Sequence, residues 1–199
     1  MRVIAGQYRS RRLQTLRGTA LRPSSDRLRE TLFNILGAAV EGAVFVDLFA
    51  GSGAVGIEAL SRGARGAIFV ENHSAGAALI ARNLASLGIP VAAQVASGKT
   101  FAGSAEILRM HAMDALERLD KVGAHIDFVY LDPPYADSRA YQEILEFLGE
   151  SELFARGGSV IAEHRRKNDL PAIAGHLERA RVVEQGDTAL SFYKPVFAA

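Results

Sequence analysis

The first forty residues show two different patterns of apolar positions. From residue 2 to residue 16, apolar and polar residues alternate loosely around a polar stretch at residues 8–11, which predicts a small N-terminal β-hairpin. From Leu28 onward, apolar residues recur at i, i+4, i+7 and i+8, which predicts an amphipathic helix with Ser24 or Ser25 as its N-cap. We expect the arginines of this helix to face outward or toward a site.

From about residue 44, short apolar runs alternate with helical patterns. The runs that we interpret as strands are 44–49, 67–71, 126–131 and 159–163, and the predicted helices are 54–61, 74–87 and 139–148. Parallel neighbours need crossover connections, so this alternation predicts an α/β fold with a mostly parallel sheet and helices on both faces. In such sheets, ligands bind beyond the carboxyl ends of the strands.

The last part of the chain differs from this pattern. Two β-prone runs, 180–184 and 189–194, flank Gly186-Asp187 and predict a C-terminal antiparallel hairpin at the edge of the sheet. Residues 89–105 are rich in small residues and are compatible with either a long loop or an interrupted strand.

The composition is that of one globular domain. The chain has 199 residues, of which 49% are hydrophobic and 23% charged, and it contains no apolar run of the roughly 18 residues needed to span a bilayer. We expect a cytoplasmic protein without a signal peptide or membrane span. It has no cysteine, and its five histidines lack paired ligand spacing, so we also expect no disulfide and no metal site.

The small net charge of +1 hides an uneven distribution. The first 30 residues contain eight arginines but only Asp26 and Glu30 as acids, a local charge of +6, so the remainder sums to −5. A guanidinium group can donate two hydrogen bonds to the oxygens of one phosphate, so this arginine cluster favours contact with a nucleic acid. The alternative is a solvated basic arm. The candidate substrate-binding residues are Arg9, Arg11, Arg12, Arg22, Arg27 and Arg29.

The strongest local motif is at residues 47–53, where a predicted strand enters a glycine turn that opens a helix. With Gly56 this turn matches the G-x-G-x-x-G pattern of nicotinamide dinucleotide enzymes, and Glu71 lies 20 residues beyond Gly51, where a ribose-binding acid is expected. However, the carboxylate of Asp47 would repel a diphosphate. The sulfonium and amino groups of S-adenosylmethionine are cations, so Asp47 favours this methyl donor, and Glu71 can accept hydrogen bonds from its ribose hydroxyls.

The second motif is Asp132-Pro133-Pro134-Tyr135, which directly follows a predicted buried strand. The two prolines stiffen the turn and remove two backbone donors, so that mainly hydrogen-bond acceptors remain. Acceptors on both N–H bonds of a base amino group would orient its lone pair toward a methyl group, and Tyr135 could stack on the base. We therefore predict Asp132, Pro133, Pro134 and Tyr135 as the catalytic motif of an amino methyltransferase; a plain tight turn is the alternative.

Other residues complete the predicted donor site. Asp114 follows a β-prone run at residues 107–110 and could accept the adenine amino group, or it could simply cap a helix. We expect His73 and His164 at the surface and do not interpret Glu163 and His164 as a dyad. The candidate cofactor-binding residues are Asp47, Phe49, Ala50, Gly51, Ser52, Gly53, Glu71, Asn72, Asp114 and Ala115.

Several longer runs match one known family. They are Arg2-Val3-Ile4-Ala5-Gly6, Leu21-Arg22-Pro23, Asp26-Arg27-Leu28-Arg29-Glu30-Thr31-Leu32-Phe33-Asn34, residues 47–53, Glu58-Ala59-Leu60-Ser61-Arg62-Gly63 and Asp132-Pro133-Pro134-Tyr135. Over nearly its whole length the chain resembles the bacterial 16S ribosomal RNA guanine-N2 methyltransferases that modify guanine 966. The glycine turn and the proline motif are common to many amino methyltransferases, whereas the arginine-rich runs are particular to this family.

The resemblance implies a Rossmann-like class I methyltransferase fold with a mostly parallel seven-stranded sheet, a C-terminal antiparallel hairpin and a small N-terminal β-hairpin. It implies a monomer in which residues 1–40 form an RNA-binding extension and residues 41–199 the S-adenosylmethionine-dependent domain. Asp47, Gly51, Glu71 and Asp114 carry over as donor-site positions. The implied substrate is the N2 amino group of a guanine in 16S rRNA, within the small ribosomal subunit or its assembly intermediate.

Two alternatives stay open at this point. The same acceptor turn could serve the N6 amino group of adenine in RNA or DNA, although about 40 N-terminal residues leave little room for a domain that reads DNA. A non-catalytic RNA-binding assembly factor could also retain the fold.

Overall fold

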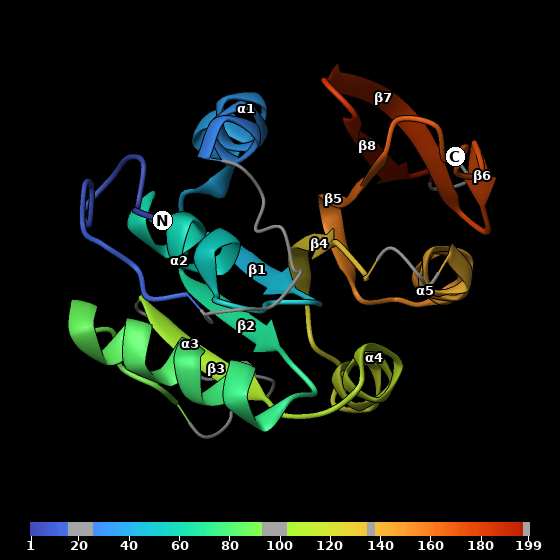
Figure 1. Cartoon of the computed structure of the whole chain (residues 1–199). Coiled ribbons are helices and arrows are strands. Elements are labelled where there is room, and N and C mark those ends of the chain that lie inside the picture. The colour runs from blue at the N-terminus through green and yellow to red at the C-terminus, as the bar shows by residue number, and fades with distance from the viewer. Residues whose placement is uncertain (16–25, 93–102, 135–137, 197–199) are drawn as a thin grey trace.

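Strands and helices alternate along most of the chain in the computed structural model, which describes residues 1–15, 26–92, 103–134 and 138–196 (Figure 1). The helices are α1 (Asp26–Leu36), the 3-10 helix η1 (Gly37–Val40), α2 (Ala54–Ser61), α3 (Ser74–Leu87), α4 (Ala112–Lys121) and α5 (Ser138–Glu150). The strands are β1 (Val44–Asp47), β2 (Gly66–Val70), β3 (Ser104–Leu108), β4 (Ile126–Leu131), β5 (Phe154–Arg165), β6 (Ile173–Ala174), β7 (Leu177–Gln185) and β8 (Thr188–Pro195).

One sheet holds all the named strands, in the order β3-β2-β1-β4-β5-β8-β7-β6. Neighbours from β3 to β5 are parallel, and β8, β7 and β6 continue the sheet in antiparallel pairs. The predicted mostly parallel sheet and C-terminal hairpin are therefore confirmed. The predicted number of seven strands is wrong: the two-residue strand β6 pairs with β7 and adds an eighth strand at the edge.

Helices cover both faces of this sheet, as the alternation predicted. The apolar residues of α4 and α5 pack in one cluster with Val44 and Val46 of β1. The apolar residues of α1, α2 and α3 pack in a second cluster with Phe45. Phe45 lies between Val44 and Val46 in β1, so its side chain points to the opposite face of the sheet. There the ring of Phe45 stacks on that of Phe33 in α1, with centroids 5.9 Å apart.

Several predicted boundaries agree with the structure, and others do not. The bounds of α2, α3 and β4 are those predicted, whereas β3 begins at Ser104, inside the stretch that the sequence left uninterpreted, and ends at Leu108. Helix α4 was not predicted. The proposed caps of α1, Ser24 and Ser25, lie outside the described residues. None of the helices in the described ranges is long and apolar enough to cross a membrane.

Residues 1–15, which we term the N-terminal arm, fold back on themselves as predicted, but with a single antiparallel bridge between Arg2 and Arg12 instead of two regular strands. The amide of Val3 donates to the Arg11 carbonyl and that of Ser10 to the Val3 carbonyl, each at 2.9 Å. Ser10 closes this turn in the left-handed region, at φ 67°. Val3 and Leu13 are buried, so the arm is packed onto the helices and is not a solvated tail.

Candidate functional site

The loop between β1 and α2 contacts the ends of the two strands that flank β1 in the sheet. The amide of Leu48 donates to the carbonyl of Tyr130 at the end of β4, and the amide of Ala50 donates to the carbonyl of Val70 at the end of β2, each at 2.9 Å. Gly51 and Gly53 then turn the chain at φ 53° and 78°, a region that other residues rarely adopt. This geometry brings the start of α2 to the carboxyl edge of the sheet, where the sequence predicted a ligand.

Gly56, the third glycine of the pattern, has a packing role. A Cβ atom at this position would lie 2.4 Å from the ring of Phe69 in β2, so only glycine lets α2 approach the sheet this closely. The G-x-G-x-x-G pattern is thus explained by helix packing and turn geometry, neither of which requires a dinucleotide.

Asp47, the last residue of β1, is buried at the base of this loop with 2% of its surface exposed. Its Oδ2 accepts a hydrogen bond of 3.2 Å from the amide of Gly56. The pKa of Asp47 is raised to about 7, mainly by burial and also by the negative charges of Glu71 and Glu163, while bonds from the amides of Gly56 and Phe49 oppose the shift. A cation beside Asp47 would therefore favour its ionised form near neutral pH.

Glu71 follows β2 and holds the glycine loop from the other side. Its Oε2 accepts the amide of Gly51 at 2.9 Å, and its Oε1 accepts the amide of His73 at 2.8 Å. The amide nitrogen of the neighbouring Asn72 side chain lies 3.4 Å from Nδ1 of His111. Glu71 therefore lies beside the glycine loop, whereas the contact of the Asn72 side chain is with His111 before α4.

Asp114 lies in the first turn of α4, six residues beyond the end of β3, and Ala115 follows it in the same helix. The alternative of a helix start therefore agrees with the structure, although the N-cap residue is His111. Asp114 is exposed, whereas Ala115 is buried in the core and its amide donates to the carbonyl of His111. A ligand could reach the Asp114 carboxylate but not the side chain of Ala115.

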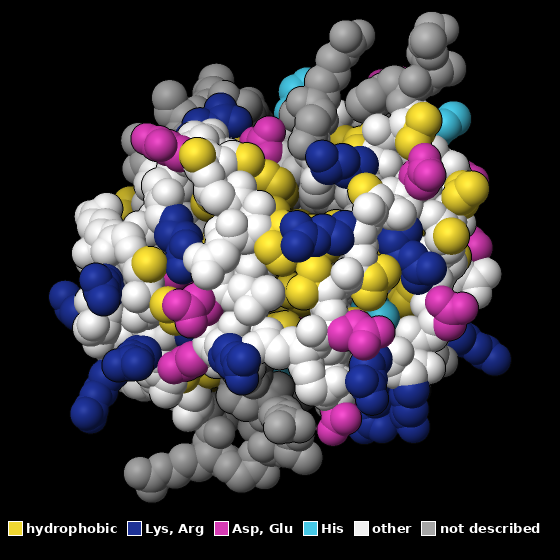
Figure 2. Space-filling view, turned by 90° about the horizontal axis from the view of Figure 1, so that it is seen from above, with side chains coloured by type: hydrophobic (Ala, Val, Ile, Leu, Met, Phe, Trp, Pro, Cys, Tyr) yellow, Lys and Arg dark blue, Asp and Glu magenta, His cyan; other side chains and the backbone are white. Residues whose placement is uncertain are grey.

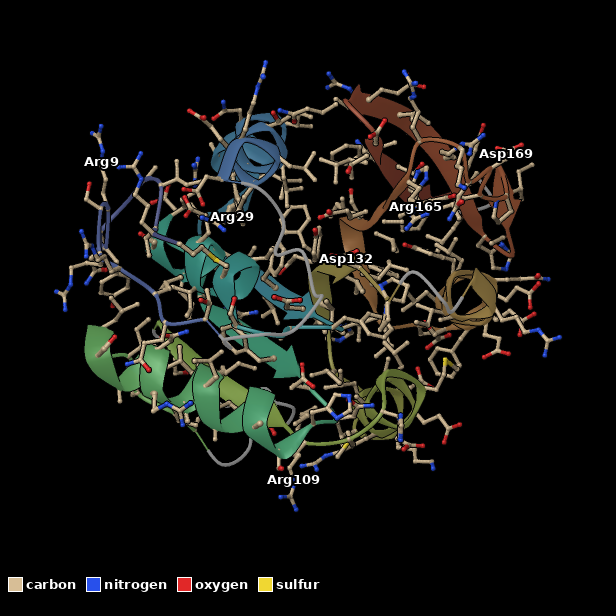
Figure 3. The ribbon with its side chains drawn as sticks, viewed as in Figure 1. Arg9, Arg29, Arg109, Asp132, Arg165 and Asp169 are labelled. Atoms are coloured by element: carbon tan, nitrogen blue, oxygen red, sulfur yellow. The ribbon has the colours of Figure 1, made fainter. Side chains whose placement is uncertain are left out.

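Asp132 lies directly beyond β4, at the centre of the same edge (Figure 3). It is half-buried, Pro133 is buried and Pro134 is exposed, while Tyr135 lies outside the described residues. The pKa of Asp132 is raised to about 8, mainly by burial and also by the negative charges of Glu163 and Asp47. The acid of the glycine loop therefore acts through space on the acid of the proline motif.

Glu163 is the site residue that sequence reasoning missed. It lies near the end of β5, is 5% exposed, and accepts a hydrogen bond from the hydroxyl of Tyr130. The only signal in the sequence was an acid near the end of a buried strand. The expected surface position of His164 is wrong: it is buried, with Nε2 2.8 Å from the hydroxyl of Ser191.

Four carboxyl groups, from Asp47, Glu71, Asp132 and Glu163, thus gather at the ends of β1, β2, β4 and β5. This acidic edge, as we term it, attracts cations and repels a diphosphate. The residues present therefore fit a ligand with a sulfonium and an ammonium group. Nowhere in the described ranges do three or more His, Asp or Glu side chains gather in a way that could hold a metal ion.

The arginines predicted to bind substrate occupy different environments. Arg9, Arg11, Arg12 and Arg27 are exposed, and Figure 3 shows Arg9 pointing away from the body of the protein. Arg11 also donates from Nη2 to the carbonyl of Ser86 in α3 at 2.7 Å. Arg22 lies outside the described residues. Figure 2 shows Lys and Arg side chains interspersed with acidic ones over the face seen from above.

The structure corrects the prediction that Arg29 binds substrate. The sequence predicted that it would face outward or toward a site, but it is 1% exposed and donates to the carbonyl of Arg2 at 2.6 Å and to Asp26 at 3.1 Å. A residue buried in this way cannot contact RNA, so its role is structural.

The N-terminal arm reaches the glycine loop through Asn83 of α3, which is fully buried. The side-chain amide of Asn83 accepts the backbone N–H of Gln14 at 2.8 Å and donates to the carbonyl of Ser52 at 2.9 Å. The hydroxyl of Ser52 also lies 3.8 Å from the sulfur of Met1. One side chain therefore connects the basic arm to the loop of the candidate site.

Comparison with known proteins agrees with this geometry. The model of the family described as "Conserved hypothetical protein 95" matches residues 1–194. Ribosomal RNA small subunit methyltransferase D of Escherichia coli (strain K12) is 33% identical over 194 residues, which cover 98% of this chain and 89% of that protein. The solved structure of yhhF from Escherichia coli shares 32% identity and a TM-score of 0.79, covering 98% of this chain and 97% of the other.

A more distant solved structure shares the fold alone. It is an RNA methyltransferase from Salinibacter ruber in complex with S-adenosyl-L-homocysteine, with 17% identity and a TM-score of 0.59 over 89% of this chain and 96% of that one. The predicted Rossmann-like methyltransferase architecture is therefore confirmed.

Proposed function

The chain belongs to the "Conserved hypothetical protein 95" family, and from this premise we propose that it transfers a methyl group from S-adenosylmethionine to the N2 amino group of a guanine in 16S rRNA. Its relative in Escherichia coli is named a small-subunit ribosomal RNA methyltransferase, which supports rRNA as the substrate. The choice of guanine N2 rests on the family resemblance of the N-terminal runs.

The acidic edge is the observation that carries this proposal. S-adenosylmethionine supplies an activated methyl group together with two cationic centres, and the residues here suit both. Asp47 and the amides of the glycine loop would hold the methionine part, and Glu71 would accept hydrogen bonds from the ribose. Asp114, with its exposed carboxylate, is the candidate partner of the adenine amino group. Phe49, Ala50, Ser52 and Asn72 would line the same donor site.

Asp132 and the carbonyl of Pro133 would accept the two N–H bonds of the target amino group. That arrangement points the nitrogen lone pair toward the donor, and Tyr135 would stack on the base. The chain's contribution is then mainly orientation and fixed electrostatics, since an in-line approach to the methyl carbon needs no covalent intermediate with the protein.

The N-terminal arm and α1 would bind the RNA. Arg9, Arg11, Arg12, Arg22 and Arg27 are the proposed phosphate contacts, and Asn83 connects this region to the donor loop. Within this proposal residues 1–40 form the RNA-binding extension and residues 41–199 the catalytic domain. The protein would act as a cytoplasmic monomer on the small subunit or on its assembly intermediate.

The test is transfer of tritiated methyl groups from S-adenosylmethionine to 30S particles from a strain that lacks the modification, followed by nucleoside analysis. N2-methylguanosine in the 16S rRNA is the expected product. Label in N6-methyladenosine would replace guanine by adenine as the target. Binding of rRNA without transfer, and without calorimetric binding of S-adenosylmethionine, would identify a non-catalytic assembly factor instead.

A further inference from the structure

Glu163 and Asp132 occupy equivalent places at the ends of adjacent parallel strands. In the register of β4 and β5, Leu131 pairs with Ala162, and Asp132 and Glu163 are the residues that follow this pair. Glu163 is buried and Asp132 is half-buried. Two carboxyl groups therefore share one poorly solvated corner of the acidic edge.

Two tyrosines fix Glu163 in this corner. The hydroxyl of Tyr130 in β4 donates to its carboxylate, and the hydroxyl of Tyr141 in α5 donates to its backbone carbonyl at 2.6 Å. Both tyrosines are buried, with 2% and 3% of their surface exposed. Because side chain and backbone are both held, the carboxylate cannot turn away from its neighbour to reach water.

The charges around Asp132 come from several strands. After desolvation, the charge of Glu163 in β5 contributes most to the raised pKa of Asp132, and the charge of Asp47 in β1 contributes next. Glu71, beyond β2, acts in turn on Asp47. From β4 and α5 the Tyr130 and Tyr141 hydroxyls, which are neutral donors, bond to Glu163. Glu163 is therefore the strongest charged influence on Asp132.

We propose that Glu163 is a positioning residue for methyl transfer: held by Tyr130, it sets the protonation state of Asp132 and so decides when Asp132 can accept an N–H bond of the target amino group. This inference rests on the proposed function. It assigns a role to a buried acid that neither the glycine loop nor the proline motif explains.

The proton balance of the reaction explains why such a residue is useful. The nitrogen lone pair forms the new N–C bond, the electron pair of the broken S–C bond stays with sulfur, and one N–H proton must leave the nitrogen. An ionised Asp132 can accept that N–H bond and then the proton, which afterwards passes to water. A neighbouring negative charge makes Asp132 a stronger base than an ordinary aspartate, which suits this task near neutral pH.

Carbon-13 NMR of the donor-free protein tests the coupling without reference to activity. Asp side-chain carboxyl carbons are labelled, the Asp132 signal is assigned by its loss in Asp132→Asn, and its titration midpoint is compared between wild type and Glu163→Gln. We expect the midpoint to fall by about one pH unit or more when the charge is removed. Glu106→Gln, which alters a buried acid of β3 paired with Arg118 at 3.7 Å, is the matched control and should leave the midpoint unchanged.

Single-turnover methylation of 30S particles provides the second measurement. The acidic limb of the pH-rate profile should move to lower pH in Glu163→Gln, in the same direction as the NMR midpoint, and Glu106→Gln should retain the wild-type profile. An unchanged Asp132 midpoint in folded Glu163→Gln would overturn the inference.

Tyr130→Phe keeps the test decisive if Glu163→Gln does not fold. Without its phenol donor the ionised form of Glu163 is less stable, so less negative charge lies beside Asp132 and the Asp132 midpoint should again fall. A midpoint equal to that of wild type would reject the role of Glu163. Wild-type protein that methylates no rRNA would reject the proposed function instead, and the NMR titration would still decide whether the two carboxyl groups are coupled.

Discussion

The guanidinium of Arg29 in α1 lies 3.7 Å from the carboxylate of Glu58 in α2, and both side chains are fully buried. The same carboxylate accepts the backbone amides of Ile4 and Ala5 at 2.8 and 3.0 Å, and Arg62 donates to it at 2.9 Å. One acid therefore joins the N-terminal arm and α1 to the helix that begins at the glycine loop. The basic extension and the donor site are parts of one folded unit.

Glu58→Gln should destabilise the protein strongly. The substitution leaves the buried Arg29 with only the partly exposed Asp26 as a counter-charge and places an amide NH2 group opposite backbone N–H donors, so we expect a loss of about 3 to 5 kcal/mol. Urea unfolding followed by circular dichroism measures it. Glu117→Gln, which breaks an exposed pair with Lys121 at 3.9 Å, is the control and should cost less than about 1 kcal/mol. Equal midpoints for the two variants would contradict the role of Glu58.

Asp47→Asn should stabilise the donor-free protein in a pH-dependent way. The folded pKa of Asp47, about 7, lies above the ordinary value of 3.8, so unfolded chains release this proton first and stability falls as pH rises through that window. Asparagine does not ionise, so Asp47→Asn should not lose stability as pH rises through this window. The melting temperature of Asp47→Asn should therefore exceed that of wild type more at pH 8 than at pH 5, measured by calorimetry without donor.

The same substitution should weaken binding of S-adenosylmethionine, because it removes the carboxylate that faces the donor's cationic groups. Wild-type affinity should rise with pH through about 7, as Asp47 ionises, whereas Asp47→Asn should lose this rise. Isothermal titration at pH 6 and pH 8 distinguishes the two. A variant that bound the donor as tightly as wild type at both pH values would remove Asp47 from the donor site.

The sequence predicted the parts of the fold that depend on local pattern. Helix α3 and strand β4 have the predicted bounds because each carries an uninterrupted apolar period that packs against the core. Strand β6 has only two residues, too few for any period, and it exists because β7 offers an edge for pairing. Helix α4 was not predicted as an element, although a helix start at Asp114 was one of the two interpretations of that residue.

The sequence predicted the site residues that belong to a recognisable motif and missed those that do not. Asp47 and Asp132 stand in recognisable loops, whereas Glu163 has no motif and acquires its role from the pairing of β5 with β4. Arg29 was interpreted by its charge as an RNA contact. Its partner Glu58 lies on another helix, and no local pattern in the sequence shows that the two meet.

The exposed arginines of the arm should contribute to RNA binding through phosphate. Replacing Arg9 and Arg12 with Gln should weaken binding of 16S rRNA and reduce the slope of log affinity against log salt by about 0.7 to 0.9 for each phosphate that is no longer neutralised. Arg11 is a less direct test because it also donates to the Ser86 carbonyl. Lys121→Gln, at the carboxyl end of α4, is the control. An unchanged slope in the double variant would mean that these exposed arginines contact no phosphate.

Gly6→Ala should detach the N-terminal arm from α2. Gly6 adopts φ +79°, and a Cβ atom there would lie 1.8 Å from the backbone oxygen of Ser61, which accepts the amide of Gln7 at 2.7 Å. Since backbone cannot yield as a side chain can, the arm must lift, and its arginines lose their place beside the site. We expect at least about a tenfold loss of rRNA affinity, equivalent to 1.4 kcal/mol, faster tryptic cleavage within the arm, and donor affinity within about twofold of wild type.

Gly37→Ala is the matched control for this prediction. Gly37 also has a positive φ, +54°, but its added Cβ atom would meet nothing within 4 Å. It should therefore show only the cost of about 1 to 2 kcal/mol for a left-handed alanine, with normal rRNA affinity and normal cleavage of the arm. The difference between the two variants isolates the contact between Gly6 and Ser61 from backbone strain. If both variants bound rRNA equally well, a docked arm would not be needed to hold the RNA, and the proposed phosphate contacts would have to lie on α1 or elsewhere.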